Sequence, residues 1–194
     1  MLQRTDGLKL INDRFADQPV VLTLGGTIRE MMAVAGRQKN HLPILDAMGQ
    51  PAAIGLGLAL GLEDTGRFRR VVVVEGDGSL LMGLSSIATI GHLKPKSLLV
   101  VIFDNGVYLA TGGQPAATAD ADFVNIALAC GWSAARDVPA DRDALDEALA
   151  WSETVDGPVM LRVKVGTEAP KTDFFLEDPV ILAREFMDWL DRPS

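Results

Sequence analysis

The sequence is poor in cysteine, in net positive charge and in long apolar runs, and each shortage argues against a class of protein. A single cysteine, Cys130, rules out a disulfide framework within the chain and favours a reducing compartment, so we expect the cytoplasm. The net charge of −8 leaves no basic footprint for nucleic acid. No apolar run reaches the roughly 18 residues that span a bilayer. The charged stretch MLQRTDGLKLINDRF lacks the apolar core of a signal peptide.

Apolar segments alternate with segments of helical spacing along the chain. Uninterrupted apolar and β-branched residues indicate buried strands at 19–24, 71–78, 97–105 and 158–165, with a shorter extended segment at 43–48. Helical spacing is found at 3–16, 27–35, 50–62, 80–92, 120–131, 141–152 and 179–191. This order predicts a doubly wound, mostly parallel α/β sheet with helices on both faces. The length suits a single domain over residues 1–194, with the first and last helices at its ends.

Three local patterns carry further expectations. Thr27 is placed to cap the helix that follows the first strand, with Glu30 at the capping-box position. The helix at 50–62 is rich in glycine and alanine, so it can approach a neighbour closely but depends on tertiary packing. The segment 109–120 is the longest irregular stretch and is a candidate active-site loop.

The stretch from EGDGSLL to FDNGVY combines two polar turns, each directly after a buried strand. Asp77 lies in the first turn and Asn105 in the second, and both are expected at the carboxyl edge of the sheet, where ligands bind in such folds. A carboxylate and an amide oxygen suit Mg²⁺ bound to a diphosphate, and the Val107 carbonyl could join them. Gly78 would let the backbone approach a phosphate, and a helix beginning near Ser79 would direct free N–H groups at it.

A plain turn between strand and helix offers another reading of the first motif. An isolated GDG is most often explained by turn geometry alone. A second motif, DNG, placed after the next buried strand favours the functional reading, because two such turns at one sheet edge can share a ligand.

These motifs resemble those of thiamin-diphosphate-dependent enzymes. GDG followed downstream by Asn is similar to that family's cofactor signature. DAMGQPAAIGLGLAL resembles the family's segment that places a large apolar residue under the cofactor. GDGSLLMGLSSIATIGHLKPKSLLVVIFDN and TGGQP resemble most closely the beta subunits of sulfopyruvate decarboxylase and the matching half of phosphonopyruvate decarboxylase. The resemblance covers roughly residues 20–166.

The resemblance implies a role for each matching position. Asp77 and Asn105 would bind Mg²⁺ through their side chains, and Val107 through its carbonyl. Met48 would be the apolar wedge that bends the cofactor, and the Asp46 carbonyl would accept a hydrogen bond from its 4′-amino group. The other positions implied to bind thiamin diphosphate are Gly26, Thr27, Gly76, Gly78, Ser79 and Tyr108.

Four further polar residues are weighed as contacts of the substrate. Thr111 and Gln114 are favoured, because they lie in the irregular loop that contains TGGQP. His41 and His92 are weaker candidates, since His41 precedes a strand-like segment and His92 ends a helix, where it can simply complement the helix dipole.

The implied activity is that of a carbon–carbon lyase, a 2-keto acid decarboxylase acting on sulfopyruvate or phosphonopyruvate. In the family, a separate pyrimidine-binding domain supplies a glutamate that contacts the cofactor. The sequence leaves no room for that domain beside the one described, and Glu30, Glu63 and Glu75 match no pattern for the glutamate. We therefore expect an alpha subunit that carries both, and a homodimer when this chain is isolated.

Two alternatives remain open at this point. The chain could be a subunit of another split thiamin-diphosphate enzyme, of the acetolactate synthase or 2-keto acid oxidoreductase type. One cysteine leaves no iron–sulfur cluster within this chain, which disfavours the oxidoreductase but not a cluster in its partner. The chain could also be a non-catalytic cofactor-binding subunit, although the intact Asp77 and Asn105 argue against that.

Overall fold

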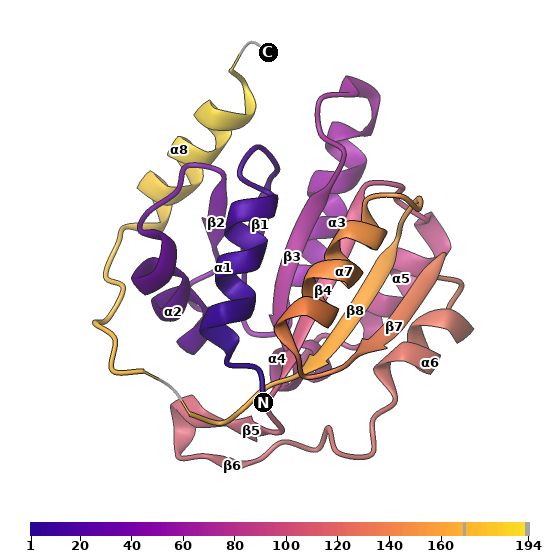
Figure 1. The fold of residues 1–194 in the computed structure, drawn as a ribbon. Coiled ribbons are helices and arrows are strands. Elements are labelled where there is room, and N and C mark those ends of the chain that lie inside the picture. The colour runs from indigo at the N-terminus through magenta and orange to yellow at the C-terminus, as the bar shows by residue number, and fades with distance from the viewer. Residues whose placement is uncertain (169, 193–194) are drawn as a thin grey trace.

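The computed structural model describes residues 1–168 and 170–192, and its centre is a six-stranded, entirely parallel sheet (Figure 1). The strand order is β2-β1-β3-β4-β8-β7. These strands are β1 (Val20–Leu22), β2 (His41–Pro43), β3 (Val71–Gly76), β4 (Leu98–Asp104), β7 (Ala134–Val138) and β8 (Val159–Lys164). A separate two-stranded hairpin consists of β5 (Val107–Tyr108) and β6 (Gln114–Pro115). The predicted α/β class and parallel sheet are confirmed.

Helices cover both faces of the sheet. They are α1 (Arg4–Arg14), α2 (Gly26–Ala35), α3 (Pro51–Leu62), α4 (Asp77–Met82), α5 (Ser85–Leu93), α6 (Phe123–Ala129), α7 (Arg142–Ser152) and α8 (Pro179–Leu190), with short 3-10 turns at Glu63–Thr65 and Leu109–Thr111. Alternate side chains of the central strands enter two separate cores, so Val72 and Val74 pack with α1, α2 and α7, while Val71 and Val73 pack with α3, α5 and α6. Apolar burial on both faces explains the uninterrupted apolar strands in the sequence.

Several element boundaries differ from the sequence prediction. The predicted extended segment at 43–48 is wrong, because β2 ends at Pro43 and the chain continues as a loop. The single helix expected at 80–92 is divided between α4 and α5 at Gly83. The edge strand β7 was not predicted, since AARDV is half exposed and lacks a continuous apolar run. The hairpin of β5 and β6 likewise lies partly within the segment predicted to be irregular.

The expected cap of the second helix is also wrong. Gly25 is the N-cap residue of α2 and makes no side-chain hydrogen bond to the helix, while Thr27 lies inside it. Glu30 does not reach back to the helix start, because both of its carboxylate oxygens accept hydrogen bonds from Arg4 on α1. A long-range ion pair therefore takes the place of the local capping box.

The strand order places one edge of the sheet in a position to bind a ligand. The crossover from β1 through α2 leads to β2 on one side of β1, whereas β3 lies on the other side. The carboxyl ends of β1 and β3 therefore diverge into different helices, which opens a crevice between them. The turn after β4 and the β5–β6 hairpin adjoin the same edge (Figure 1). Within the described ranges, no helix combines the length and apolarity needed to cross a membrane.

Candidate functional site

A cleft of about 130 Å³ lies at the carboxyl edge of the sheet, at this point of divergence. Its walls come from the turns after β1, β3 and β4 and from the loop before α3. Most of the predicted site residues line it together, namely Gly26, Thr27, Met48, Gly76, Asp77, Gly78, Ser79, Asn105, Val107, Tyr108 and Thr111. Asp46 and Gln114 are not among its lining residues. The structure thus brings together segments that lie far apart in the sequence.

Asp77 is buried at the base of this cleft, where α4 begins. Its Oδ2 accepts a hydrogen bond of 2.6 Å from the hydroxyl of Thr118. Thr118 is fully buried and lies in the loop that the sequence assigned to the active site. This hydrogen bond fixes the carboxylate and ties the loop to it, and no local motif signals a contact across 41 positions.

The turn after β4 is held by its own acidic and amide side chains. Asp104 Oδ1 accepts from the Gly106 N–H at 3.1 Å, and Asn105 Oδ1 accepts from the Val107 N–H at 3.1 Å. Asp104 is buried and also pairs with Arg162 and Lys164 from β8. These contacts position Asn105 and the following backbone at the cleft, while Asp104 itself serves the turn.

Ser79 joins three segments of the cleft wall. Its hydroxyl oxygen accepts from the Thr23 hydroxyl at 3.0 Å and from the Gly49 N–H at 3.1 Å. The side chain of Ser79 is buried, and α4 begins two residues earlier than predicted, at Asp77. The turn after β1, the loop before α3 and the start of α4 are therefore linked through one oxygen.

Glu75 lies next to these residues but faces the protein interior. The side chain is fully buried, and neither carboxylate oxygen has a hydrogen-bond partner among the described residues. Burial raises the pKa of Glu75 to about 7, although the nearby hydroxyls of Ser79 and Thr23 and the N–H groups of Ala52 and Gly76 oppose the shift. Glu75 is absent from the cleft lining, so it does not present a carboxylate to a ligand there.

Gly78 is required by the packing of Tyr108. A Cβ atom at Gly78 would lie 2.3 Å from Cε1 of the Tyr108 ring, and the Tyr108 hydroxyl donates to the Gly78 carbonyl at 3.2 Å. The glycine lets the ring lie against the turn after β3. The predicted reason for this glycine, close approach of a phosphate, stays a prediction beside this packing contact.

Met48 and Asp46 occupy different parts of the loop before α3. Met48 is half-buried and lines the cleft, as expected of an apolar wedge. Asp46 is exposed and lines an adjoining cavity together with Leu45 and the segment Phe174–Glu177. Gly25 and Arg29 border both spaces, which makes them neighbouring parts of one edge.

The structure places the four candidate substrate-contact residues at different distances from the cleft lining: one lines it and three do not. Thr111 is exposed and lines the cleft, and Gln114 donates to the Thr111 hydroxyl at 2.5 Å without lining it. His41 is buried in β2 away from the cleft, and burial lowers its pKa to about 4, so it is an uncharged core residue. His92 lies on the last turn of α5 and lines no described cavity near the cleft.

Two arginines that the sequence analysis did not identify also border the cleft. Arg4 is tied to Glu30 and lies so close to Gly26 that a Cβ there would lie 2.5 Å from its Nη2. Arg29 lies on the first turn of α2 and pairs with no carboxylate in residues 1–168 and 170–192. Neither side chain belongs to a local motif, and only the tertiary fold places them here.

Residues 30–163 match the family described as the C-terminal TPP binding domain of thiamine pyrophosphate enzymes. The chain belongs to that family. Thiamine pyrophosphate (TPP) is the same compound as thiamin diphosphate, so the recognition drawn from GDG and DNG is confirmed. The matched range includes the turns after β3 and β4 and the loop before α3.

The similar proteins differ in length. The chain is 34% identical over 181 residues to sulfopyruvate decarboxylase subunit beta from Methanothermobacter thermautotrophicus, covering 92% of this chain and 91% of that one. It is 35% identical over 191 residues to phosphonopyruvate decarboxylase from Streptomyces viridochromogenes, covering 95% of this chain and 45% of that one. The chain thus spans less than half the length of the phosphonopyruvate decarboxylase.

Solved structures support the fold. Benzoylformate decarboxylase from Polynucleobacter necessarius superposes with a TM-score of 0.73 at 22% identity, covering 87% of this chain and 34% of that chain. A thiamin diphosphate-dependent enzyme from Mycobacterium smegmatis gives a TM-score of 0.72 at 22% identity, over 86% of this chain and 32% of that one. At such identities the likeness concerns the fold.

The donor groups of this TPP-binding domain fit a diphosphate with a hard cation. Asp77 and Asn105 offer oxygen atoms, the ligand type that Mg²⁺ prefers. No group of three His, Cys, Asp or Glu side chains in the described residues could hold a metal ion alone. A cation in this cleft would therefore depend on Asp77, on amide and backbone oxygens, and on the phosphates themselves.

Proposed function

We propose that this chain is the TPP- and Mg²⁺-binding subunit of a decarboxylase that acts on sulfopyruvate or phosphonopyruvate with the help of a second subunit. The 34% identity to a sulfopyruvate decarboxylase subunit beta over 91% of that protein carries the proposal. Relatives named phosphonopyruvate decarboxylase, at 35% and 40% identity, support the same substrate group. Both names describe removal of CO₂ from a keto acid with a second acidic group.

In the proposed reaction, different residues of the cleft have different roles. When bound, TPP supplies the electron sink for cleavage of the carbon–carbon bond. Asp77 and Asn105 hold the cation, with the Val107 carbonyl beside them, and Thr118 keeps the Asp77 carboxylate in place. Met48 gives apolar support from the loop before α3.

The hairpin of β5 and β6 provides the substrate side of the proposed site. Thr111 borders the cleft, and Gln114 donates a hydrogen bond to its hydroxyl. Leu109 and Ala110 place apolar side chains along the same wall, which helps to exclude water. Thr111 is thus proposed to orient the keto acid and Gln114 to position Thr111.

A second subunit completes the proposed enzyme. The relative named subunit beta has nearly the same extent as this chain, whereas the phosphonopyruvate decarboxylase relatives are more than twice as long. The extra length in those relatives is where we place the pyrimidine-binding part, and an alpha subunit would supply it here.

Release of CO₂ from three keto acids tests the substrate. The chain is assembled with its partner, TPP and Mg²⁺, and kcat/KM is measured for sulfopyruvate, phosphonopyruvate and pyruvate. We expect one of the first two to exceed pyruvate, and removal of Mg²⁺ by a chelator to abolish release. A preference for pyruvate or for a bulky aromatic keto acid would instead point to another TPP enzyme with divided subunits.

A further inference from the structure

The guanidinium of Arg29 forms no ion pair with a carboxylate in the described residues. The chain carries a net charge of −8, so carboxylates are abundant, yet the Arg29 guanidinium pairs with none of them in the described residues. Arg4, the other cation at the cleft, is neutralised by both carboxylate oxygens of Glu30. Of the two arginines that line the cleft, Arg29 is the one without an ion pair in the described residues, although Asp173, Asp46 and Glu177 line the other cavities that it borders.

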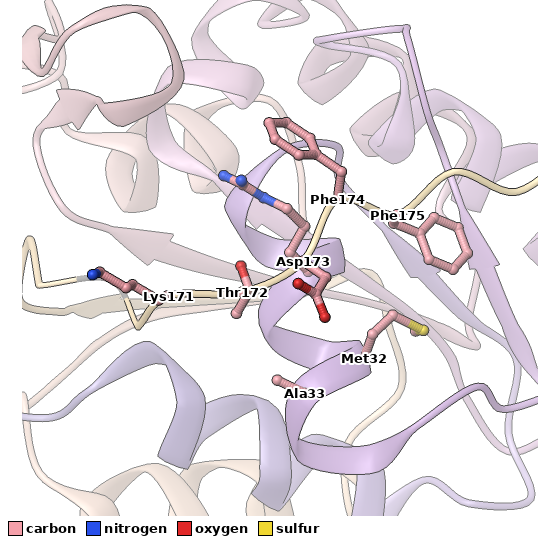
Figure 2. A pocket seen from close by; sticks show the side chains of 8 residues that line it. Met32, Ala33, Lys171, Thr172, Asp173, Phe174 and Phe175 are labelled. Atoms are coloured by element: carbon pink, nitrogen blue, oxygen red, sulfur yellow. The ribbon is translucent and has the colours of Figure 1, made fainter.

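Arg29 is held at the junction of three spaces. It lines the TPP cleft, the adjoining cavity beside Asp46, and a cavity of about 380 Å³ between α2 and the segment Lys171–Phe175. Figure 2 shows this last cavity, with Met32 and Ala33 on α2 facing the segment that carries Phe174 and Phe175. The half-buried position reduces the screening of its charge by water.

An aromatic ring orients the guanidinium. The Arg29 Cζ atom lies 5.3 Å from the centroid of the Phe174 ring, which is a cation–π contact. Stacking on one face leaves the edge N–H groups of a guanidinium free to donate. Those donors form a planar fork that matches two oxygens of a sulfonate or phosphonate.

The position of Arg29 separates it from the diphosphate end of the cleft. The metal-binding candidates Asp77 and Asn105 line the cleft but neither of the other two cavities that Arg29 borders. In TPP the reactive thiazolium lies between the diphosphate and the aminopyrimidine. Arg29 lines both the cleft that contains Asp77 and the cavity beside Asp46, so its guanidinium adjoins space away from the two metal-binding candidates.

We infer that Arg29 binds the second anionic group of the substrate, the sulfonate or phosphonate, and so selects dianionic 2-keto acids over pyruvate. The inference rests on the proposed function and adds a residue that determines specificity. The Arg29 fork donates hydrogen bonds to two oxygens of the tetrahedral anion, the positive end of α2 adds a favourable field, and Phe174 keeps the fork oriented. Pyruvate carries a hydrogen atom in place of the sulfonate or phosphonate, so Arg29 adds nothing to its binding.

Substitution of Arg29 tests the selection. In the assembled enzyme with TPP and Mg²⁺, Arg29→Met should lower kcat/KM for sulfopyruvate and phosphonopyruvate on the order of 10- to 100-fold, the loss expected when charge-assisted hydrogen bonds are removed. The effect on pyruvate should be much smaller. Arg29→Lys keeps the charge but not the fork and should give an intermediate loss. Equal losses for all three acids would overturn the inference.

A matched control and a binding measurement complete the test. Arg67 also stacks on an aromatic ring, Phe68 at 5.1 Å, but it precedes β3 at the opposite edge of the sheet, so Arg67→Met should change no substrate preference. The affinity of Arg29→Met for TPP should equal that of the wild type. A weakened affinity for TPP would place Arg29 at the diphosphate and refute the inference.

Titration with phosphonoacetate distinguishes this inference from the proposed function. Phosphonoacetate carries a carboxylate and a phosphonate but has no keto group to react, and acetate is the control lacking the phosphonate. Binding that exceeds that of acetate and is lost in Arg29→Met supports the anion site, even if the wild type releases CO₂ from none of the three keto acids. In that event the proposed function fails alone. Phosphonoacetate binding that Arg29→Met leaves unchanged contradicts the inference, whatever the activity.

Discussion

Two acidic residues at the junction of β3 and α4, Glu75 and Asp77, have different surroundings. Glu75 is enclosed by the core without a hydrogen-bond partner among the described residues, and its pKa is raised to about 7 by burial. Asp77 is equally buried but lies at the cleft and accepts from Thr118. The chain changes from β3 to α4 between these two residues, and of the pair Asp77 lines the cleft whereas Glu75 does not.

Replacement of Asp77 tests that assignment. Asp77→Ala should remove Mg²⁺-dependent TPP binding, because a hard-cation site with so few protein ligands depends on its anionic one. Titration calorimetry with TPP and Mg²⁺, in the assembled protein, measures the affinity. Asp120→Ala is the matched control, since Asp120 is exposed in the same loop as Thr118 and does not line the cleft. An unchanged affinity in Asp77→Ala, with the domain folded, would disprove the metal site.

The sequence identified the residues of the cleft that belong to local motifs and missed those that depend on the tertiary fold. GDG and DNG directly follow buried strands, and parallel strands end at one edge, so Asp77 and Asn105 could be placed together. Thr118, Arg4 and Arg29 carry no such signal. Arg4 and Arg29 reach the cleft, and Thr118 reaches Asp77, from segments whose path is fixed only by packing, as the 41-position separation of Thr118 from Asp77 illustrates.

At the scale of elements, two glycines explain why the predicted helix at 80–92 is divided. A Cβ atom at Gly83 would lie 1.9 Å from the carbonyl oxygen of Gly49, and Gly49 itself has a φ of +78°. The loop before α3 therefore crosses the chain between α4 and α5 with its backbone in contact. Helical periodicity alone cannot reveal a crossing by another segment, and Met48 is adjacent to this contact.

Alanine substitutions of two glycines should have opposite effects on stability. Gly83→Ala should lower the free energy of unfolding by roughly 1–3 kcal/mol, because the added methyl overpacks against Gly49. Gly57 lies inside α3 with nothing within 4 Å of its Cβ position, so Gly57→Ala should raise stability by about 0.5–1 kcal/mol. Urea unfolding of the two variants measures both values. Equal midpoints would contradict the proposed backbone contact.

At the scale of the whole molecule, an exposed apolar surface beside the cleft supports our expectation of a partner chain. Phe174 and Leu176, at 78% and 90% exposure, lie on the segment beside the cleft, and Val180 and Ile181 on α8 continue the exposed apolar surface. Such surfaces commonly mark contacts with another chain. The sequence could not predict this patch, because the apolar pattern of α8 reads equally well as a core helix.

Within residues 1–168 and 170–192, no glutamate is among the residues that line the cleft. Glu30 is bound to Arg4, Glu75 is enclosed in the core, and Glu63 lies in the 3-10 turn after α3. Glu177 is exposed on the segment Phe174–Glu177 and lines the cavity beside Asp46, not the cleft itself. A partner that supplies the glutamate therefore remains our expectation.

The isolated chain, supplied with TPP and Mg²⁺, should show no decarboxylation, and activity should appear when the pyrimidine-domain subunit is added. The physical reason is that this domain holds the diphosphate end, while the proton relay to the aminopyrimidine comes from the other side of the cofactor. Without its partner, the chain should associate with itself through the exposed apolar surface, as a homodimer measurable by analytical ultracentrifugation. Steady-state CO₂ release by the chain alone is the deciding measurement. Full turnover there would show that the glutamate belongs to this chain, and Glu177→Gln would then identify whether the residue beside Asp46 is the one.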